Sequence, residues 1–135
     1  MAADLPEFYF RTRENGAQVF RVDTANRHQR IEMEPIATVN TRSGEIKPQG
    51  GRALGAAEQA AIEDWLAARR AVLAEREVDD ILRTVDHLNL TAHWAQTRAD
   101  DAALDRVTDA LLMAMHDLRT VLVRKKAERM GKGGE

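Results

Sequence analysis

Residues 56–130 read AAEQAAIEDWLAARRAVLAEREVDDILRTVDHLNLTAHWAQTRADDAALDRVTDALLMAMHDLRTVLVRKKAERM. This stretch of 75 residues contains neither glycine nor proline, and every glycine and proline of the chain lies before Ala56 or after Met130. Because these two residue types interrupt helices most strongly, their distribution predicts a turn-rich N-terminal part and a long helical C-terminal part.

The apolar residues of the helical stretch change face along its length. At 100° per residue, one face carries Ile62, Trp65, Leu66 and Leu73, and a second carries Val78, Ile81, Leu82, Val85, Leu88 and Ala92. Either the helix breaks near Ala74–Asp80, or a single helix from Ala56 to Arg98 buries different faces against different neighbours. We favour the break, because one helix of about 64 Å exceeds the breadth of a compact domain of this length.

A further helix is predicted to begin at Asp100-Asp101, where acidic side chains can cap the positive end of the helix dipole. Its apolar stripe is Leu104, Val107, Leu111, Met115, Leu118 and Leu122. This spacing is typical of a bundle or an antiparallel coiled coil, and the short link predicts that the helix runs antiparallel to the preceding one and covers its second apolar face. We expect the helical part to end near residue 127 and residues 131–135 to form a disordered tail.

The N-terminal part begins with a predicted β-hairpin. EFYFRTR (7–13) and AQVFRVD (17–23) flank Asn15-Gly16, which suits a two-residue type I′ turn. This turn places Arg11 opposite Phe20 and Tyr9 opposite Val22.

Further short strands are predicted at residues 30–34, 36–40 and 45–47, with an edge or a break at Pro35. Leu54, Gly55 and Glu58 then resemble a hydrophobic staple and a partial capping box before the first helix. The predicted fold is therefore α+β. An antiparallel meander of four or five short strands (residues 7–47) precedes two or three helices (residues 56–127) that form an antiparallel hairpin or small bundle, and residues 1–130 make a single domain.

Catalytic and metal-binding patterns are not found in the sequence. Cysteine is absent, which excludes thiol chemistry and Cys-type zinc sites. Ser43 is the only serine and lies in a predicted turn, which disfavours a serine triad. His87 and His93 are six residues apart and lie on nearly opposite sides of a helix, so they cannot hold one ion. We expect no enzymatic activity, no metal and no cofactor.

Charge and hydropathy favour protein partners. The net charge of −2 is nearly balanced, so no strong field attracts the chain to nucleic acid or to a membrane surface. No run of 18 apolar residues exists, and the N-terminus has no secretory signal pattern. We therefore expect a cytoplasmic protein that does not enter a membrane.

The most informative candidate site is an apolar helical face. His87, Leu90 and Trp94 lie away from the Ile81–Leu88 stripe, and an exposed aromatic patch marks a binding surface. We predict a non-enzymatic interaction or regulatory module that uses this face to bind a protein partner or a second copy of itself.

Nucleic-acid binding by the sheet is the alternative function. Arginines alternate with aromatic residues along the predicted strands, which suits phosphate contacts combined with base stacking. The residues concerned are Tyr9, Arg11, Arg13, Arg21 and Arg30.

Overall fold

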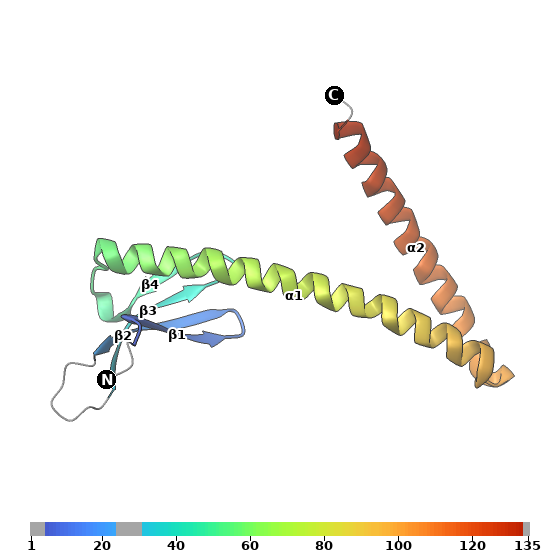
Figure 1. Ribbon diagram of the computed structural model, residues 1–135, viewed down its shortest axis with the longest axis horizontal. Helices are drawn as coiled ribbons and strands as arrows, with labels where there is room; N and C mark the ends of the chain where they lie inside the picture. The colour runs from blue at the N-terminus through green and yellow to red at the C-terminus, as the bar shows by residue number, and fades with distance from the viewer. Residues whose placement is uncertain (1–4, 24–30, 134–135) are drawn as a thin grey trace. The chain divides into compact units, whose positions relative to one another are not determined.

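The computed structural model describes residues 5–23 and 31–133, and it has the predicted α+β architecture (Figure 1). Four strands form an antiparallel meander in the order β1 (Phe8–Arg13), β2 (Gly16–Asp23), β3 (Glu32–Asn40) and β4 (Ile46–Pro48). A short 3₁₀ turn, η1 (Gln49–Gly51), leads to two long helices, α1 (Ala56–Thr97) and α2 (Asp101–Gly133). The chain divides into two compact units, residues 1–80 and 81–135.

The hairpin differs from the prediction by two residues. Tyr9 pairs with Phe20 and Arg11 pairs with Gln18, so the turn is Glu14-Asn15 instead of Asn15-Gly16. The predicted pairs Arg11–Phe20 and Tyr9–Val22 are therefore wrong. Because side chains alternate with a period of two, the shift leaves the same residues together on each face of the hairpin.

Gly16 explains why the turn moves. Gly16 is the first residue of β2 and pairs with Asn40 of β3, and a Cβ placed on it would lie 1.9 Å from the carbonyl oxygen of Val39. Only glycine lets β3 come this close. Gly16 is thus required by strand packing, and not by the positive φ that a type I′ turn demands at this position.

Pro35 lies inside β3, where the sequence predicted an edge or a break between two strands. Val19 pairs with Ala37 whereas its neighbour Phe20 pairs with Pro35, so Ile36 is the extra residue of a bulge. Within the described sheet, β4 pairs only with Ala37–Val39, so this stretch of β3 has one neighbour, β2. Proline has no N–H to donate to a neighbouring strand, so it is tolerated at a bulge and where the strand has a neighbour on one side only.

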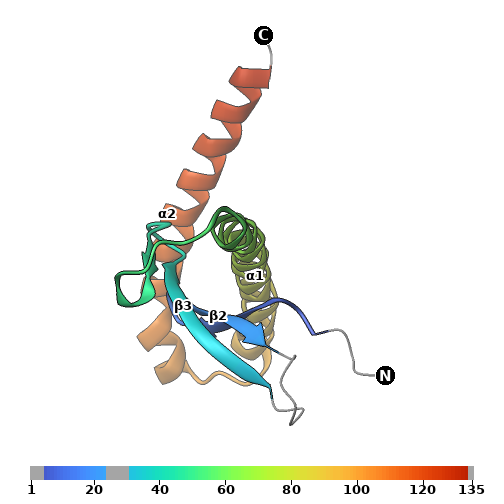
Figure 2. The ribbon, with the colours of Figure 1, turned by 90° about the vertical axis from the view of Figure 1, so that its left-hand side faces the viewer.

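The core lies between one face of the sheet and the first half of α1. Ile62 and Leu66, on the first predicted helical face, are buried against strand residues that include Val19 and Val39. Trp65 of the same face stacks on a β1 ring, that of Phe10, with 5.0 Å between the ring centroids. Figure 2, which looks along α1, shows β2 and β3 passing on one side of the helix. The predicted packing face is therefore confirmed.

The sheet is also tied to α1 by a polar contact. The guanidinium Nε of Arg70 donates a hydrogen bond of 2.8 Å to the carbonyl oxygen of Thr41, in the turn that joins β3 to β4. Asn40 closes the same turn, because its side-chain oxygen accepts hydrogen bonds from the amides of Arg42 and Ser43. The turn is thus fixed from both its own strand and the helix.

Helix α1 runs without interruption from Ala56 to Thr97, so the predicted break near Ala74–Asp80 is wrong. The change of apolar face in that region reflects a change of surroundings and not a change of direction. The face around Ile62 covers the sheet, whereas Val78 on the second face is 52% exposed. No glycine or proline lies here to break the helix.

Helix α2 begins where the sequence placed it. The Asp100 carboxylate accepts a 2.8 Å hydrogen bond from the amide of Ala103, which confirms the predicted N-cap. The described helix continues to Gly133, past the residue at which a disordered tail was expected to begin.

Candidate functional site

The three residues predicted to form an interaction face are not equivalent in the structure. Trp94 is half-buried and lines an apolar cavity of about 230 Å³, together with Leu88 of α1 and Leu104 and Leu111 of α2. His87 is exposed, and Leu90 is 66% exposed. The side chain of Trp94 is thus partly covered by its neighbours within residues 81–133, whereas those of His87 and Leu90 are open to solvent.

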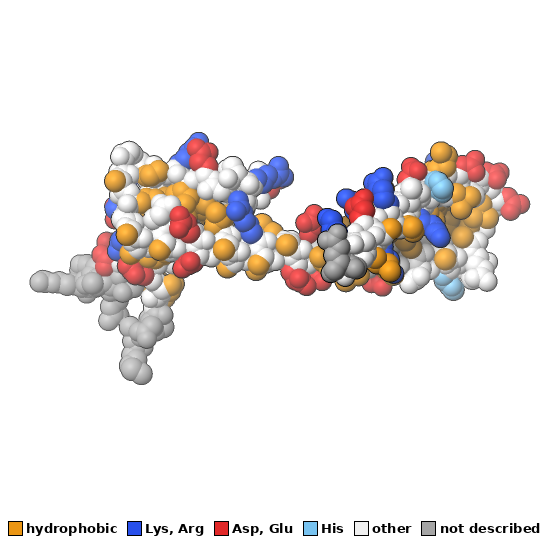
Figure 3. All heavy atoms as spheres, turned by 90° about the horizontal axis from the view of Figure 1, so that it is seen from above, with side chains coloured by type: hydrophobic (Ala, Val, Ile, Leu, Met, Phe, Trp, Pro, Cys, Tyr) orange, Lys and Arg blue, Asp and Glu red, His pale blue; other side chains and the backbone are white. Residues whose placement is uncertain are grey.

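A second apolar surface is larger than the predicted one. Along α2, Leu111, Met115, Leu118 and Leu122 are between 36% and 59% exposed. Figure 3 shows hydrophobic side chains, drawn in orange, at the surface of this helical part. The stripe that the sequence predicted to form the seam of a helical hairpin is therefore uncovered along most of its length.

The second face of α1 is also uncovered. Ile81, Leu82 and Val85 are between 53% and 65% exposed, so the prediction that α2 covers this face is wrong. Among the described residues, only side chains near the turn, such as Leu88 and Leu104, become half-buried. Sequence periodicity identifies which residues share an apolar face, but it does not show which face finds a partner within the chain.

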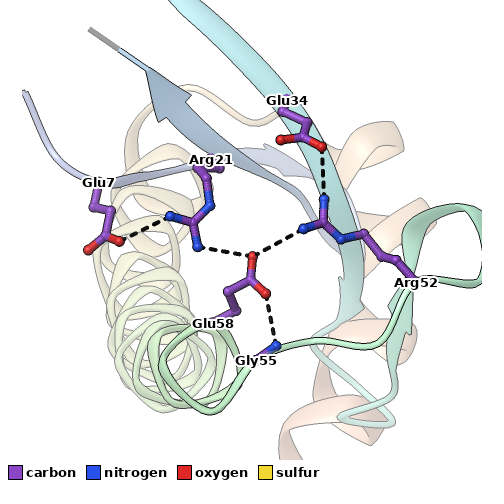
Figure 4. A network of polar contacts seen from close by, with 6 residues as sticks. All are labelled: Glu7, Arg21, Glu34, Arg52, Gly55 and Glu58. Atoms are coloured by element: carbon purple, nitrogen blue, oxygen red, sulfur yellow. Dashed lines mark hydrogen bonds and ion pairs between the residues drawn. The ribbon is translucent and has the colours of Figure 1, made fainter. Parts of the chain in front are cut away.

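A polar network joins the start of α1 to the sheet (Figure 4). One carboxylate oxygen of Glu58, Oε1, accepts a 2.8 Å hydrogen bond from the amide of Gly55, which completes the partial capping box. The other, Oε2, lies 3.2 Å from Nη2 of Arg21 and 3.7 Å from Nη2 of Arg52. The same two arginines pair outward, Arg21 with Glu7 at 3.3 Å and Arg52 with Glu34 at 2.9 Å.

Glu58 is a buried carboxylate whose charge is stabilised by these neighbours. Its pKa is lowered, first by the backbone hydrogen bond from Gly55 and then by the hydrogen bond from Arg21, while burial acts in the opposite direction. Sequence reasoning found the cap but missed the arginines, because Arg21 is 37 residues away in the chain. The contacts drawn in Figure 4 link the start of α1 to β2 and β3, so the network stabilises the fold.

The proposed nucleic-acid residues are divided between two faces of the sheet. Tyr9, Arg11 and Arg13 alternate along β1 and share the face opposite the core. Arg21 lies on the other face, where it pairs with Glu58 and Glu7, so it does not share a surface with Arg11 and Arg13. Arg30 lies outside the described residues.

The outer face of β1 has its own contacts. The guanidinium carbon of Arg11 lies 4.6 Å from the centroid of the Phe20 ring, and Tyr9 contacts the same ring with 6.3 Å between centroids. Arg13 donates a 3.0 Å hydrogen bond to the side chain of Gln18. These contacts hold the side chains of Arg11 and Arg13 on an exposed surface.

Two kinds of site are not found in the described parts of the chain. Residues 5–23 and 31–133 contain no group of three or more His, Asp or Glu side chains placed to hold a metal ion. Neither α1 nor α2 contains an apolar segment of the length and composition needed to cross a bilayer.

The chain was also compared with known proteins. No protein family, curated protein or solved structure matches it. The arguments for function therefore come from the surfaces described above, of which the uncovered stripe of α2 is the most extensive.

Proposed function

We propose that this protein is a non-enzymatic interaction module, whose helical part binds a second protein chain by burying the apolar stripe of α2 and the exposed face of α1. The observation that carries the proposal is the exposure of Leu111, Met115, Leu118 and Leu122, which follow one another along one side of a regular helix. Contiguous apolar surface of this kind marks a binding site, whereas single exposed leucines do not.

The free energy gained by burying the α2 stripe of one chain is too small by itself to hold a complex together. Complete burial of a large apolar side chain contributes about 1.5–3 kcal/mol, so four half-exposed side chains hold roughly 3–6 kcal/mol. Two matching helices would contribute about twice that amount. This is comparable with the cost of association, about 4–15 kcal/mol, so the exposed face of α1 around Ile81 and Val85 is expected to contribute as well.

The experiment is the solution mass by light scattering over a concentration series, for the wild type, Leu111→Asp and the control Met113→Asp. Leu111 lies on the stripe, whereas Met113 is exposed and lies about 200° around the helix from it. We expect the wild type to exceed the 15.1 kDa of a single chain. Leu111→Asp should return the mass to the monomer value and Met113→Asp should not. A wild-type mass of one chain at every concentration would refute binding between copies.

Nucleic-acid binding by the outer face of β1 is a second candidate, favoured by the common face of Tyr9, Arg11 and Arg13. The acidic residues Glu7 and Glu34 are paired within the Glu58 network, so they do not neutralise these two arginines. An exposed ring and two guanidinium groups on one face provide both stacking and phosphate contacts.

This candidate predicts salt-dependent retention on single-stranded DNA or RNA. The variant Arg11→Glu/Arg13→Glu should lose retention, because two phosphate contacts become repulsive. Arg119→Glu, on α2, is the control and should bind as the wild type does. Equal retention of all three proteins would exclude the sheet as the binding surface.

A further inference from the structure

The apolar residues of α2 also follow a regular seven-residue repeat. Leu104, Val107, Leu111, Ala114, Leu118 and Val121 follow one another at intervals of three, four, three, four and three. These are the a and d positions of a coiled-coil heptad, with Leu104, Leu111 and Leu118 at a. Met115 and Leu122 are the next residues along and widen the stripe.

Charge is distributed unevenly along the same helix. Residues 100–112 contain four acidic side chains and one basic side chain, whereas residues 113–133 contain six basic and two acidic ones. Two parallel copies of α2 would place like charges side by side. Two antiparallel copies would place the acidic half of each helix beside the basic half of the other, which is attractive.

We propose that α2 pairs in antiparallel orientation with α2 of a second copy of this chain, in the register that sets Leu104 opposite Val121 of that copy. The proposal names the partner of the stripe and rests on the proposed function. An antiparallel coiled coil packs a positions against d positions, and this register does so throughout, with Val107 opposite Leu118 and Leu111 opposite Ala114.

The register chosen by the apolar residues also satisfies the charges. Asp100 occupies the d position before Leu104 and Lys125 the a position after Val121, so the register places Asp100 opposite Lys125 of the second copy, once at each end because the pair is two-fold symmetric. Apolar spacing and charge are independent features of the sequence. Their agreement on one register is the main argument for this partner.

The apolar cavity beside Trp94 fits the same arrangement. Leu104 lines this cavity, and the register brings Val121 of the second copy to Leu104. The cavity has a volume of about 230 Å³, which can receive an aliphatic side chain or two. The C-terminal part of one α2 would thus fill the space beside the first turns of the other.

Disulfide trapping tests the orientation directly, because the chain contains no cysteine. Two single variants are prepared, Leu104→Cys and Val121→Cys, one of them with a mass tag, and oxidised separately and as a mixture. In the mixture we expect cross-linked dimers that contain one Leu104→Cys chain and one Val121→Cys chain. Either variant oxidised by itself should give little cross-linking. Circular dichroism of each variant confirms that the helices are retained.

Reversed charges provide a second readout that does not alter the apolar seam. Lys125→Asp should weaken self-association about tenfold, since its two symmetric contacts with Asp100 change from attraction to repulsion. The matched control Lys126→Asp, at a position that faces away from the second helix, should keep the wild-type dissociation constant. Asp100 is left unchanged because its carboxylate caps α2.

The outcomes separate this proposal from the function on which it rests. Cross-linking of each cysteine variant by itself, with equal dissociation constants for Lys125→Asp and Lys126→Asp, would show a parallel pair and overturn the register but not the proposed function. A wild-type dimer that is lost in Leu111→Asp yet gives no mixed cross-link would do the same. Wild-type protein that stays monomeric would overturn the proposal together with binding between copies.

Discussion

Replacing Gly16 with alanine should destabilise the sheet by about 2–4 kcal/mol. The added Cβ would lie 1.9 Å from the carbonyl oxygen of Val39, and ordinary contact begins near 3.4 Å, so β2 and β3 must separate by about 1.5 Å at this end. Overpacking of this kind costs about 1–3 kcal/mol. Separation also weakens backbone hydrogen bonds such as that from the Thr41 amide to the Asn15 carbonyl, at about 0.5–1.5 kcal/mol each.

Urea unfolding followed by tryptophan fluorescence measures this loss. Trp65 stacks on Phe10 and reports on the sheet, so the measurement is made in a Trp94→Phe background. Gly50→Ala is the control, because Gly50 has φ near 61° but nothing within 4 Å of an added Cβ, and its cost is backbone strain of about 1–2 kcal/mol. If Gly16→Ala lost no more stability than Gly50→Ala, the close approach of β3 would not be what requires glycine.

Three further substitutions test the core, the capping network and the turn between the helices. Ile62→Ala should lower the free energy of unfolding by about 2–5 kcal/mol, because Ile62 is fully buried between α1 and the sheet; denaturant unfolding measures it, and Glu63→Ala is a surface control. Glu58 has a lowered pKa, so its contribution is present above the ordinary glutamate pKa of 4.5 and is lost as the pH falls through the lower folded value. Glu58→Gln should therefore reduce the melting temperature at pH 7 and flatten its decline in acid, and equal slopes for both proteins would contradict the role of its charge. Trp94→Ala should cost about 1–3 kcal/mol in the helical unit, since Trp94 is half-buried beside an apolar cavity, and unchanged thermal unfolding by circular dichroism would show that this packing contributes nothing.

Local signals in the sequence predicted the elements well. The absence of glycine and proline after Ala56 predicted the helical part, Asp100 predicted the start of α2, and Gly55 with Glu58 predicted the start of α1. Each of these features depends on residues within a few positions of one another. The face of α1 around Ile62 and Leu66, which is buried in the structure, could also be predicted, because helical periodicity is a local property of the sequence.

The hairpin register was missed for a different reason. Asn15-Gly16 is a strong turn signal, and shifting the hairpin by two residues leaves every side chain on the same face. The pattern of apolar and polar residues therefore cannot distinguish the two registers. The deciding contact is between Gly16 and the backbone of Val39, which lies 23 positions later in the chain.

The candidate sites depended even more on distant contacts. Nothing near Arg21 in the sequence indicates that it meets Glu58, so it was grouped with Arg11 and Arg13 on the basis of spacing. The change of apolar face at residues 74–80 was interpreted as a break because a single helix of about 64 Å exceeds the breadth expected of a compact domain of this length. In the structure α1 is continuous, and Ile81, Leu82 and Val85 on its second face are exposed, which is the pattern on which the proposed partner rests.

The position of Glu58 has a consequence for how α1 opens in solution. Helix ends normally exchange their amide hydrogens fastest, because the first amides have no partner within the helix. Here the carboxylate that accepts the Gly55 amide is also held by Arg21 of β2 and by Arg52. Freeing that amide requires breaking the contacts that join Glu58 to the sheet, so the Gly55 amide should exchange its hydrogen far more slowly than the amide at an ordinary helix start.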